Sequence, residues 1–392
     1  MTGGREMRRI GAEERRGRLA GRQLGGGAGR VEDVVAGLVA LHATDPATVF
    51  LSVAARLGGA PGRAVPALET ALYEDRTLVR MLAMRRTMFV LPREAAPGVY
   101  AAAGRAIAVK ERKGLLAFLA EGGGWDERWL TEVEAEVVAA LAEHGDCTGA
   151  ELSRLVPRLR EQVVVARGKP YEARQNVASR IIRVLAAEGR IARQRPAGSW
   201  TSSQFRWAAS EPLPEVPAAQ ARADLAGAWL AAYGPGTEAD LKWWSGWTLT
   251  DTRKALAAVG AEAVQLDGGP GFVAPGDAGP AAEPPPPAAL LLPALDPTPM
   301  GWQDRDWFLP RSHRADLFDR SGNVGPTVWW GGEVIGGWAH RADGTVAWRL
   351  LSDRGTEAAA AVEAAAGSLA ERLTGVTVTP RFRTPLEREL SA

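Results

Sequence analysis

The chain has 392 residues, a formal net charge of +1 and one cysteine, Cys147. Its hydrophobic fraction of 46% and charged fraction of 24% are typical of a globular protein with room for two or three domains. No apolar run reaches the roughly 18 residues of a membrane span. The start, MTGGREMRRI, lacks the apolar core of a secretory signal. We therefore expect a cytoplasmic protein.

The cysteine and histidine content gives no sign of a metal site. A single cysteine excludes an intrachain disulfide and a cysteine-based metal site. The four histidines, at positions 42, 144, 313 and 340, do not have metal-ligand spacing. We expect no metal and no cofactor.

Charge is distributed unevenly along the chain. Residues 148–210 carry 12 Lys and Arg against 4 Asp and Glu, a net charge of +8. Residues 211–299 carry 4 against 11, a net charge of −7. Because phosphates attract clustered basic residues, the first of these segments is a candidate surface for a polyanion and the second is not.

The chain opens with a basic helical segment over residues 11–24, followed by a GGGAG turn. Its basic residues allow two interpretations, contact with phosphate or a solvated helix face, and the pattern favours the solvated face.

Residues 31–57 predict a helix, a break and a second helix. Apolar residues recur at helical spacing from Val31 to Leu41. Pro46 disfavours the α conformation at the residue before it, so the first helix is predicted to end near residues 41–44. The second helix is predicted to resume at about residue 47. The break therefore places a short extended segment between two buried helices.

The extended segment carries three polar residues. Side chains two apart in an extended segment point the same way, so His42 and Thr44 are predicted to face one cavity, with Asp45 beside them. One interpretation is a hydrogen-bonded core histidine, with Asp45 as the cap of the second helix. The other is a functional site, because burying unpaired polar groups is costly.

The first part of the chain has the element order of a winged helix. A third helix is predicted over residues 65–73, and the alternation in TLVRMLAMRRTMFVL, residues 77–91, indicates a strand pair. Arg80, Arg85 and Arg86 are then expected near the wing. A further helical region is predicted over residues 93–120.

Residues 127–210 repeat this order and give the clearest local signal. A helix over residues 131–144 precedes Thr148, which forms a capping box with Glu151. A hairpin is predicted around residues 162–170, then a helix over residues 172–188, then two strands around a Gly-Ser turn. Polar side chains on the exposed face of the last helix would reach base edges or phosphates. The alternative is a surface helix with many ion pairs.

Nucleic acid is the favoured partner of this second part. The candidate DNA-binding residues in it are Lys169, Arg174, Asn176, Arg180, Arg183, Arg193, Arg195 and Trp200.

The order occurs a third time in residues 217–275, here with acidic character. Thr237 is predicted to cap the second helix of this part and Thr250 to open the third. Three tryptophans, Trp243, Trp244 and Trp247, are assigned to packing between modules rather than to base stacking.

Beyond a proline-rich linker at residues 280–287, the class of structure changes. Strands are predicted over residues 289–295, 327–330, 333–339, 346–351 and 376–381, with a helix over 357–373. This pattern predicts a compact α+β or small-barrel domain. In the loop 296–310, Asp304, Arg305 and Asp306 either approach a ligand or form a local ion-pair cluster. Arg305 is a further candidate DNA-binding residue.

The predicted fold class is therefore α+β, with three winged-helix units and a C-terminal β-barrel-like α+β domain. The expected domains are residues 1–125, 126–210, 211–280 and 281–392.

Several blocks of the sequence resemble the bacterial tandem winged-helix DNA glycosylases of the AlkZ and YcaQ type. They are LVALHATDPATVFLSVAARL, RMLAMRRTMFVLP, LLLPALDPTPMGWQDRDWF and GEVIGGWAHR, together with the basic start. The resemblance covers nearly the whole chain. It implies three winged-helix units in a C-shape around double-stranded DNA, followed by a β-barrel domain. It also implies excision of bulky N7-alkylated purines, or unhooking of interstrand crosslinks, without a metal. We expect a monomer.

The resemblance places the family's catalytic motif, Gln-apolar-Gln or Gln-apolar-Asp, at the break in residues 42–44. Here the motif reads His42-Ala43-Thr44, which keeps the spacing and changes both polar residues. An alkylated purine is already cationic and leaves without a general acid, so the site must place a water and stabilise positive charge on the sugar. The candidate catalytic residues are His42 to activate water, Thr44 to orient it, and Asp45 to supply negative charge.

Three hypotheses follow: a DNA glycosylase, a DNA-binding protein without catalysis, and a protein that sequesters a small molecule in the cleft. Preference for lesion-bearing duplex separates the first from the second. A flat salt dependence of DNA binding would favour the third, because phosphate contacts release counterions.

Overall fold

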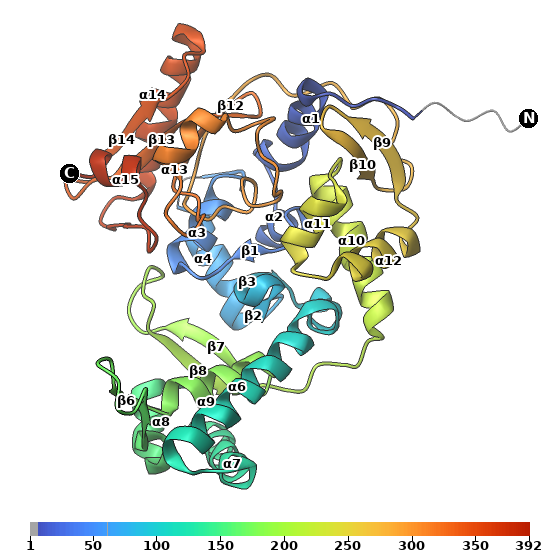
Figure 1. Cartoon of the computed structure of the whole chain (residues 1–392). Helices are drawn as coiled ribbons and strands as arrows, with labels where there is room; N and C mark the ends of the chain where they lie inside the picture. Colours follow the sequence, from blue (N-terminus) through green and yellow to red (C-terminus); the bar gives the residue numbers. More distant parts are fainter. Residues whose placement is uncertain (1–6, 61) are drawn as a thin grey trace, which may run out of the picture.

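The computed structural model describes residues 7–60 and 62–392 and has a mixed α/β fold (Figure 1). Its sheets are small and antiparallel, with two to four strands each. Residues 1–6 lie outside the described residues. They belong to the N-terminal segment in which we expect no secretory signal. None of the helices within the described ranges is long and apolar enough to cross a membrane.

The first part of the chain contains helices and a three-stranded sheet. In chain order its elements are α1 (Ala12–Leu19), η1 (Ala20–Leu24), α2 (Val31–Gly37), β1 (Leu41–His42), α3 (Pro46–Ala54), α4 (Ala64–Glu69), η2 (Thr70–Glu74), β2 (Leu78–Ala83), η3 (Met84–Arg86) and β3 (Thr87–Pro92). The sheet order is β1-β3-β2. Four helical elements follow: η4 (Arg93–Ala95), α5 (Ala96–Val99), η5 (Tyr100–Gly104) and α6 (Arg105–Gly123).

The predicted end of the first helix is wrong by one turn. α2 ends at Gly37, and Val39 has a left-handed φ of 63°. The chain then enters β1, where Leu41 pairs with Val90 and His42 with Phe89 of β3. Strand pairing with a distant segment therefore ends the helix before Pro46 can act.

The second part has its own apolar core. Its elements are α7 (Glu127–His144), β4 (Cys147–Thr148), α8 (Gly149–Leu155), η6 (Pro157–Arg160), β5 (Gln162–Val165), β6 (Ala173–Asn176), α9 (Ala178–Ala187), β7 (Ile191–Pro196) and β8 (Phe205–Ala209). The predicted capping box of Thr148 and Glu151 is confirmed. The predicted hairpin around residues 162–170 is also confirmed, since β5 pairs with β6.

The helix predicted over residues 172–188 is wrong in its first third. Residues 173–176 form β6, and α9 begins only at Ala178. Arg174 and Asn176 therefore lie on an exposed strand of a hairpin rather than on a helix face. Ala, Arg, Gln and Asn are not strong strand formers, so pairing with β5 overrides their local preference.

The third part comprises α10 (Ala218–Tyr233), α11 (Glu238–Ser245), α12 (Leu249–Ala258), β9 (Glu262–Leu266) and β10 (Gly269–Val273). Thr237 caps α11 as predicted, but the cap of α12 is Thr248 rather than a start at Thr250. Gly236, after the first helix, bridges to Phe272 in the last strand.

One connection pattern recurs in all three parts. In each, a short segment that follows a helix pairs with the last strand of a later hairpin: β1 after α2 with β3, β4 after α7 with β8, and Gly236 after α10 with Phe272. In each part the hairpin is therefore joined to the chain that directly follows this helix.

The C-terminal part contains β11 (Ala289–Leu292), η7 (Arg311–His313), α13 (Arg314–Leu317), β12 (Thr327–Trp330), β13 (Glu333–His340), β14 (Val346–Leu350), α14 (Gly355–Arg372) and α15 (Pro385–Leu390). The expected small barrel is wrong, because the sheet order β11-β12-β13-β14 is open. The strand expected at residues 376–381 is also wrong. This segment is irregular and lies against the helix-break region, where the backbone N–H of Arg381 bonds to Asp45.

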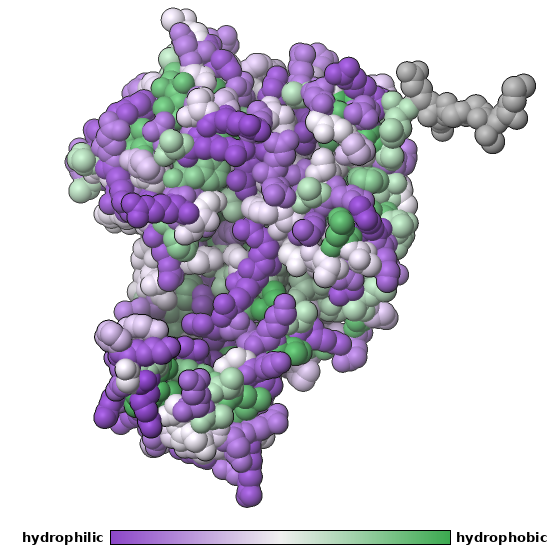
Figure 2. Space-filling model, viewed as in Figure 1, coloured by the Kyte–Doolittle hydropathy of each residue, from purple (hydrophilic) through white to green (hydrophobic). Residues whose placement is uncertain are grey.

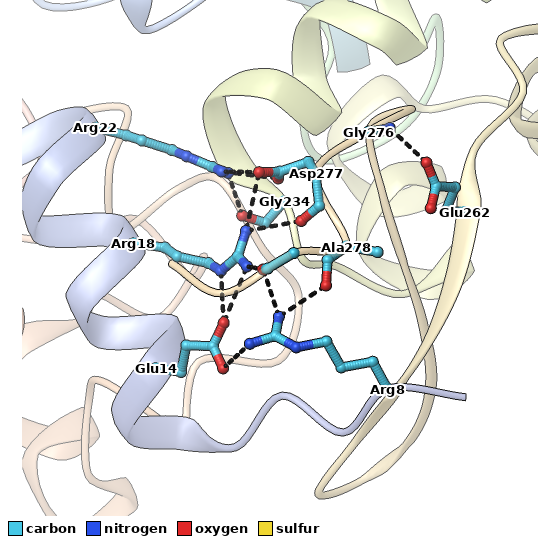
Figure 3. A network of polar contacts seen from close by, with 10 residues as sticks. Arg8, Glu14, Arg18, Arg22, Gly234, Glu262, Gly276, Asp277 and Ala278 are labelled. Carbon is cyan, nitrogen blue, oxygen red and sulfur yellow. Dashed lines mark hydrogen bonds and ion pairs between the residues drawn. The ribbon is translucent and has the colours of Figure 1, made fainter. Parts of the chain in front are cut away.

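The basic side chains of the N-terminal segment point toward the third part of the chain (Figure 3). Arg18 and Arg22 both bond to Asp277, at 3.0 and 2.7 Å, and Arg18 also pairs with Glu14 at 2.9 Å. Arg8 pairs with Glu14 and bonds to backbone carbonyls at residues 278 and 279. These arginines serve neither as phosphate contacts nor as a solvated face, because they hold α1 against the segment after β10.

A buried ion pair joins the first and last parts of the chain. Arg56, just beyond α3, makes a bidentate pair with Asp296 at 2.8 and 2.9 Å, and the two side chains are 4% and 0% exposed. The remaining guanidinium N–H groups bond to the Gln23 and Ser52 carbonyls and the Thr298 hydroxyl. Because every donor has a partner, the charge is accommodated without water.

Removing one member of this pair leaves the other charged and buried, so we expect Asp296→Asn to destabilise the protein by about 3–5 kcal/mol. Arg349→Ala, which removes an exposed pair with Glu389, is the matched control and should cost at most about 1 kcal/mol. Urea unfolding of both variants measures the difference. Equal, small losses would show that the buried pair is not a principal constraint.

Candidate functional site

The segment between α2 and α3 holds the predicted site residues in an extended conformation. Leu41 and Ala43 are both 0% exposed and pack into the apolar core of the first part. The alternation of an extended chain directs His42 and Thr44 to the opposite side. The ladder continues past β1, since the Ala43 N–H bonds to the Met88 carbonyl at 2.8 Å.

His42 is buried against an aromatic ring. It is 7% exposed, and its ring centroid lies 4.7 Å from that of Phe89. No residue in the described part of the chain makes a hydrogen bond to either ring nitrogen of His42. The pKa of His42 is lowered to about 3, chiefly by burial and also by the charge of Arg85, while the charge of Asp296 opposes the shift. The ring is therefore neutral at pH 7, with one N–H and one free lone pair.

Thr44 and Asp45 differ in the hydrogen bonds that their side chains make. Thr44 is half-buried, and its hydroxyl has no hydrogen-bond partner in the described part of the chain. Asp45 is the N-cap of α3, where its carboxylate accepts from the Ala47 N–H at 3.1 Å and the Arg381 N–H at 2.9 Å. Burial raises the pKa of Asp45, and these two hydrogen bonds act against the rise. The helix-cap interpretation therefore describes the Asp45 geometry, while His42 and Thr44 keep free polar atoms.

A cationic cluster lies beside His42. Arg85, in the turn between β2 and β3, has a left-handed φ of 54° and sits 4.0 Å from the ring centroid of Trp243. Arg305 approaches the same ring at 4.8 Å. Burial lowers the pKa of Arg305 to about 10, with Arg314 and Arg85 adding to the effect. Neither guanidinium forms an ion pair with an acid of the described chain, so both keep donors for an anion.

Other candidate arginines gather where the first and second parts meet. Arg80 on β2 and Arg193 on β7 lie on the ring of Phe205, at 4.7 and 4.9 Å from its centroid. Arg183 of α9 faces the same region, and its charge contributes to lowering the pKa of Arg193 to about 10, an effect dominated by burial.

Three further candidates make contacts with other residues of the protein. Arg86 pairs with Glu111. Arg195 pairs with Glu69 at 2.7 Å and Glu74 at 3.1 Å. Trp200 packs on Phe50, with centroids 5.1 Å apart. Arg195 and Trp200 thus tie the hairpin of the second part to the first part.

The remaining candidates lie on or next to the β5–β6 hairpin. Lys169 and Arg174 are exposed on it. Asn176 accepts from the Ala178 N–H at the start of α9. Arg180 lies 3.9 Å from the ring centroid of Phe118 and bonds to Gln175.

The structure also shows roles that the sequence pattern did not reveal. Trp244 and Trp247 are buried as expected, and the Trp247 indole N–H bonds to the Ala102 carbonyl in η5. Trp243 is grouped with them in the sequence, but its ring instead contacts the guanidinium groups of Arg85 and Arg305. Arg56 and Asp296 lie in two of the quoted sequence blocks, but their pairing across 240 residues has no local signal.

Two cavities lie at the boundary between the first and second parts, with volumes of about 930 and 450 Å³. Neither is lined by His42 or Thr44. Within the described residues, no group of three or more His, Cys, Asp or Glu is placed to hold a metal ion.

Comparison with known proteins gives a family match and a similar structure. A family model described as DNA glycosylase AlkZ-like matches residues 35–372. The solved structure of Streptomyces sahachiroi DNA glycosylase AlkZ is similar at a TM-score of 0.69 and 22% identity, covering 95% of this chain and 99% of that chain. At this identity the likeness establishes the fold. No curated protein matches the chain.

The lowered pKa of His42 predicts a specific acid sensitivity. The unfolded chain protonates His42 below about pH 6.5, whereas the folded chain does so only below about 3. Stability is therefore lost as the pH falls from about 6.5 toward 3. When the pH falls from 7 to 4.5, the protonation of His42 in the unfolded chain should reduce the free energy of unfolding of the wild type by roughly 2–3 kcal/mol. His42→Gln should not show this part of the loss.

Urea unfolding across this pH range measures the effect. His144→Gln, at an exposed histidine, is the control and should follow the wild type. An unchanged pH dependence in His42→Gln would mean that His42 titrates normally in the folded protein.

Proposed function

The chain belongs to the AlkZ-like DNA glycosylase family, and from this we propose that it hydrolyses the N-glycosidic bond of bulky N7-alkylated purines in double-stranded DNA, crosslinked purines included. The observation that carries the proposal is the position of His42. It lies on an extended segment between two helices, buried, neutral and with a free lone pair.

The proposal includes the architecture that presents this segment to DNA. We propose that the three repeated parts are winged-helix units and that together they form a C-shaped monomer around the duplex; the order of helices and a hairpin in each part supports this. Figure 2 shows a hollow between the lobe of the second part and the C-terminal lobe. The exposed basic hairpin β5–β6 and the cluster of Arg85 and Arg305 would meet DNA phosphates.

The reaction requires little proton transfer to the leaving group. The bond from the sugar carbon to the purine nitrogen breaks, and its electrons neutralise the cationic alkylpurine as it departs. Water then forms the new bond to the sugar carbon and releases a proton to solvent. What the protein supplies is placement of the water and stabilisation of the oxocarbenium-like sugar.

His42 suits placement better than strong base catalysis. With a pKa lowered to about 3, its imidazole accepts a hydrogen bond from water but binds a proton weakly. Thr44, on the same side of the segment, supplies a second oxygen for the same water. Asp45 is committed to capping α3 and acts by fixing the segment.

We expect wild-type protein to release N7-methylguanine, and then a bulky N7 adduct, from duplex DNA. His42→Ala should reduce base release by about 100-fold or more with DNA affinity unchanged, because it removes the acceptor for water. His42→Gln, which restores an amide acceptor found in the family motif, should retain more activity than His42→Ala. His144→Ala is the control and should match the wild type.

Absence of release from every alkylated duplex, with tight and salt-dependent binding to ordinary duplex, would contradict the glycosylase proposal. It would support instead a DNA-binding protein without catalysis, which the replacement of both polar residues in the family motif favours.

A further inference from the structure

The cavity of about 450 Å³ lies where β2 of the first part meets α9 and β7 of the second. Figure 1 shows β2 facing these two elements across the boundary between the upper body and the lower lobe. Fifteen residues line the cavity, and none of these described residues is acidic. Its charged residues are three arginines, Arg80, Arg183 and Arg193.

Arg80 is the strongest sign that the cavity takes an anion. The residue is only 7% exposed, and its one hydrogen bond in the described structure joins Nη1 to the Tyr73 hydroxyl at 3.2 Å. Its Nε and Nη2 atoms are buried without a partner. An arginine does not lose its proton when buried, so its charge persists. An unpaired buried charge is costly, and a bound anion would remove that cost.

Arg193 lies against the same Phe205 ring and also has a buried, unpartnered nitrogen. Its guanidinium lies 4.9 Å from the Phe205 centroid and 5.3 Å from that of Trp207, and its Nε is buried without a partner. The charges of Arg80, Arg381 and Arg183 all reach it. Four arginines therefore concentrate positive potential at one boundary. The contrast is Arg195, two residues on, which is neutralised by two glutamates.

The rest of the lining adds the start of α9 and an apolar wall. Ala178 and Ser179 belong to the first turn of α9, where the Ala178 N–H is already bonded to the Asn176 side chain. Met81, Met88, Ile182 and Trp207 supply an apolar surface. A volume of about 450 Å³ is that of a small-molecule pocket and exceeds what a bare phosphate fills.

We propose that this cavity binds a nucleotide, with its phosphate on Arg80 and Arg193 and its base against the methionine and tryptophan wall. Two sources share this chemistry: a free nucleoside monophosphate, and one nucleotide of a bound DNA strand. The second source rests on the proposed function, whereas binding of the first does not.

The neighbouring cavity of about 930 Å³ shares Arg80 and Arg193 and adds Arg76 and Arg93, but it is also lined by Asp75, Glu94 and Glu211. These three carboxylates offset most of the positive charge of its arginines, whereas no carboxylate of the described residues lines the smaller cavity, so the phosphate is assigned to the smaller cavity. Arg93 lines only the larger one, which makes it a matched control.

The test measures the thermal midpoint of the full chain with dGMP, inorganic phosphate or deoxyguanosine, at matched ionic strength. At 100 times its Kd, dGMP should raise the midpoint of the wild type by about 3 °C. Inorganic phosphate should require a higher concentration for the same rise, and deoxyguanosine should have little effect. No rise with either dGMP or phosphate would overturn the proposal.

Arg80→Met separates a ligand-binding role from a structural one. Because it removes an unpaired buried charge, it should leave the midpoint of the free protein equal or higher and weaken dGMP binding at least 10-fold. Arg93→Met should keep the wild-type response. A lower midpoint with an unchanged dGMP response would show that Arg80 only supports the fold, and would overturn the proposal.

Binding of duplex DNA distinguishes the two sources. If the nucleotide belongs to a bound strand, saturating duplex should abolish the dGMP response, and Arg80→Met should reduce the slope of log affinity against log salt by about 1. If the nucleotide is free, dGMP and duplex should bind together with an unchanged slope. Base release is not measured, so failure of the glycosylase proposal leaves these results interpretable.

Discussion

The buried pair of Arg56 and Asp296 is the interaction on which the site geometry depends. It fixes the end of α3 to the loop that follows β11, far away in the sequence. The Thr48 hydroxyl adds a bond to the Ala294 carbonyl at 2.7 Å, and the Ser52 hydroxyl one to Asp296 at 2.6 Å. One face of α3 is thus attached to the C-terminal part along two turns. The extended segment that contains His42 leads directly into this helix. Fixing the helix therefore also fixes the end of the segment.

The third part of the chain holds the other end of that segment. The Tyr233 hydroxyl donates to the Leu38 carbonyl at 2.9 Å, beside the left-handed Val39. Tyr233 is held in turn, since its carbonyl accepts from the Trp302 indole at 3.0 Å. A left-handed β-branched residue is strained, and such strain persists only where surrounding contacts enforce it. Helix α2, the break and α3 are therefore positioned by residues from two distant regions, the end of α10 and the loop after β11.

Two kinds of buried polar residue result, and their difference bears on function. Arg56 has a partner for every donor, which is the mark of a structural charge. Arg80, Arg193 and Arg305 each keep a buried Nε without a partner and rest on aromatic rings. Rings hold a guanidinium in place without using its N–H donors. His42 belongs with this second group, because Phe89 holds its ring while its polar atoms stay free. Phosphate bound near Arg85 would also cancel part of the effect that lowers the pKa of His42.

The sequence by itself determined the local features whose cause is local. Helical periodicity, the capping box at Thr148 and the alternation of Leu41 and Ala43 against His42 and Thr44 all act over a few residues, and the structure has them. Only the tertiary structure decided which partners these elements find. Residues 173–176 became a strand because β5 lies beside them, and α2 ended early because β3 pairs with β1. Arg193 and Arg195 occupy one strand, yet one meets no acid of the described chain while the other meets two. Hydrogen bonding and charge act across space rather than along the chain, so the fate of each arginine was fixed by the fold.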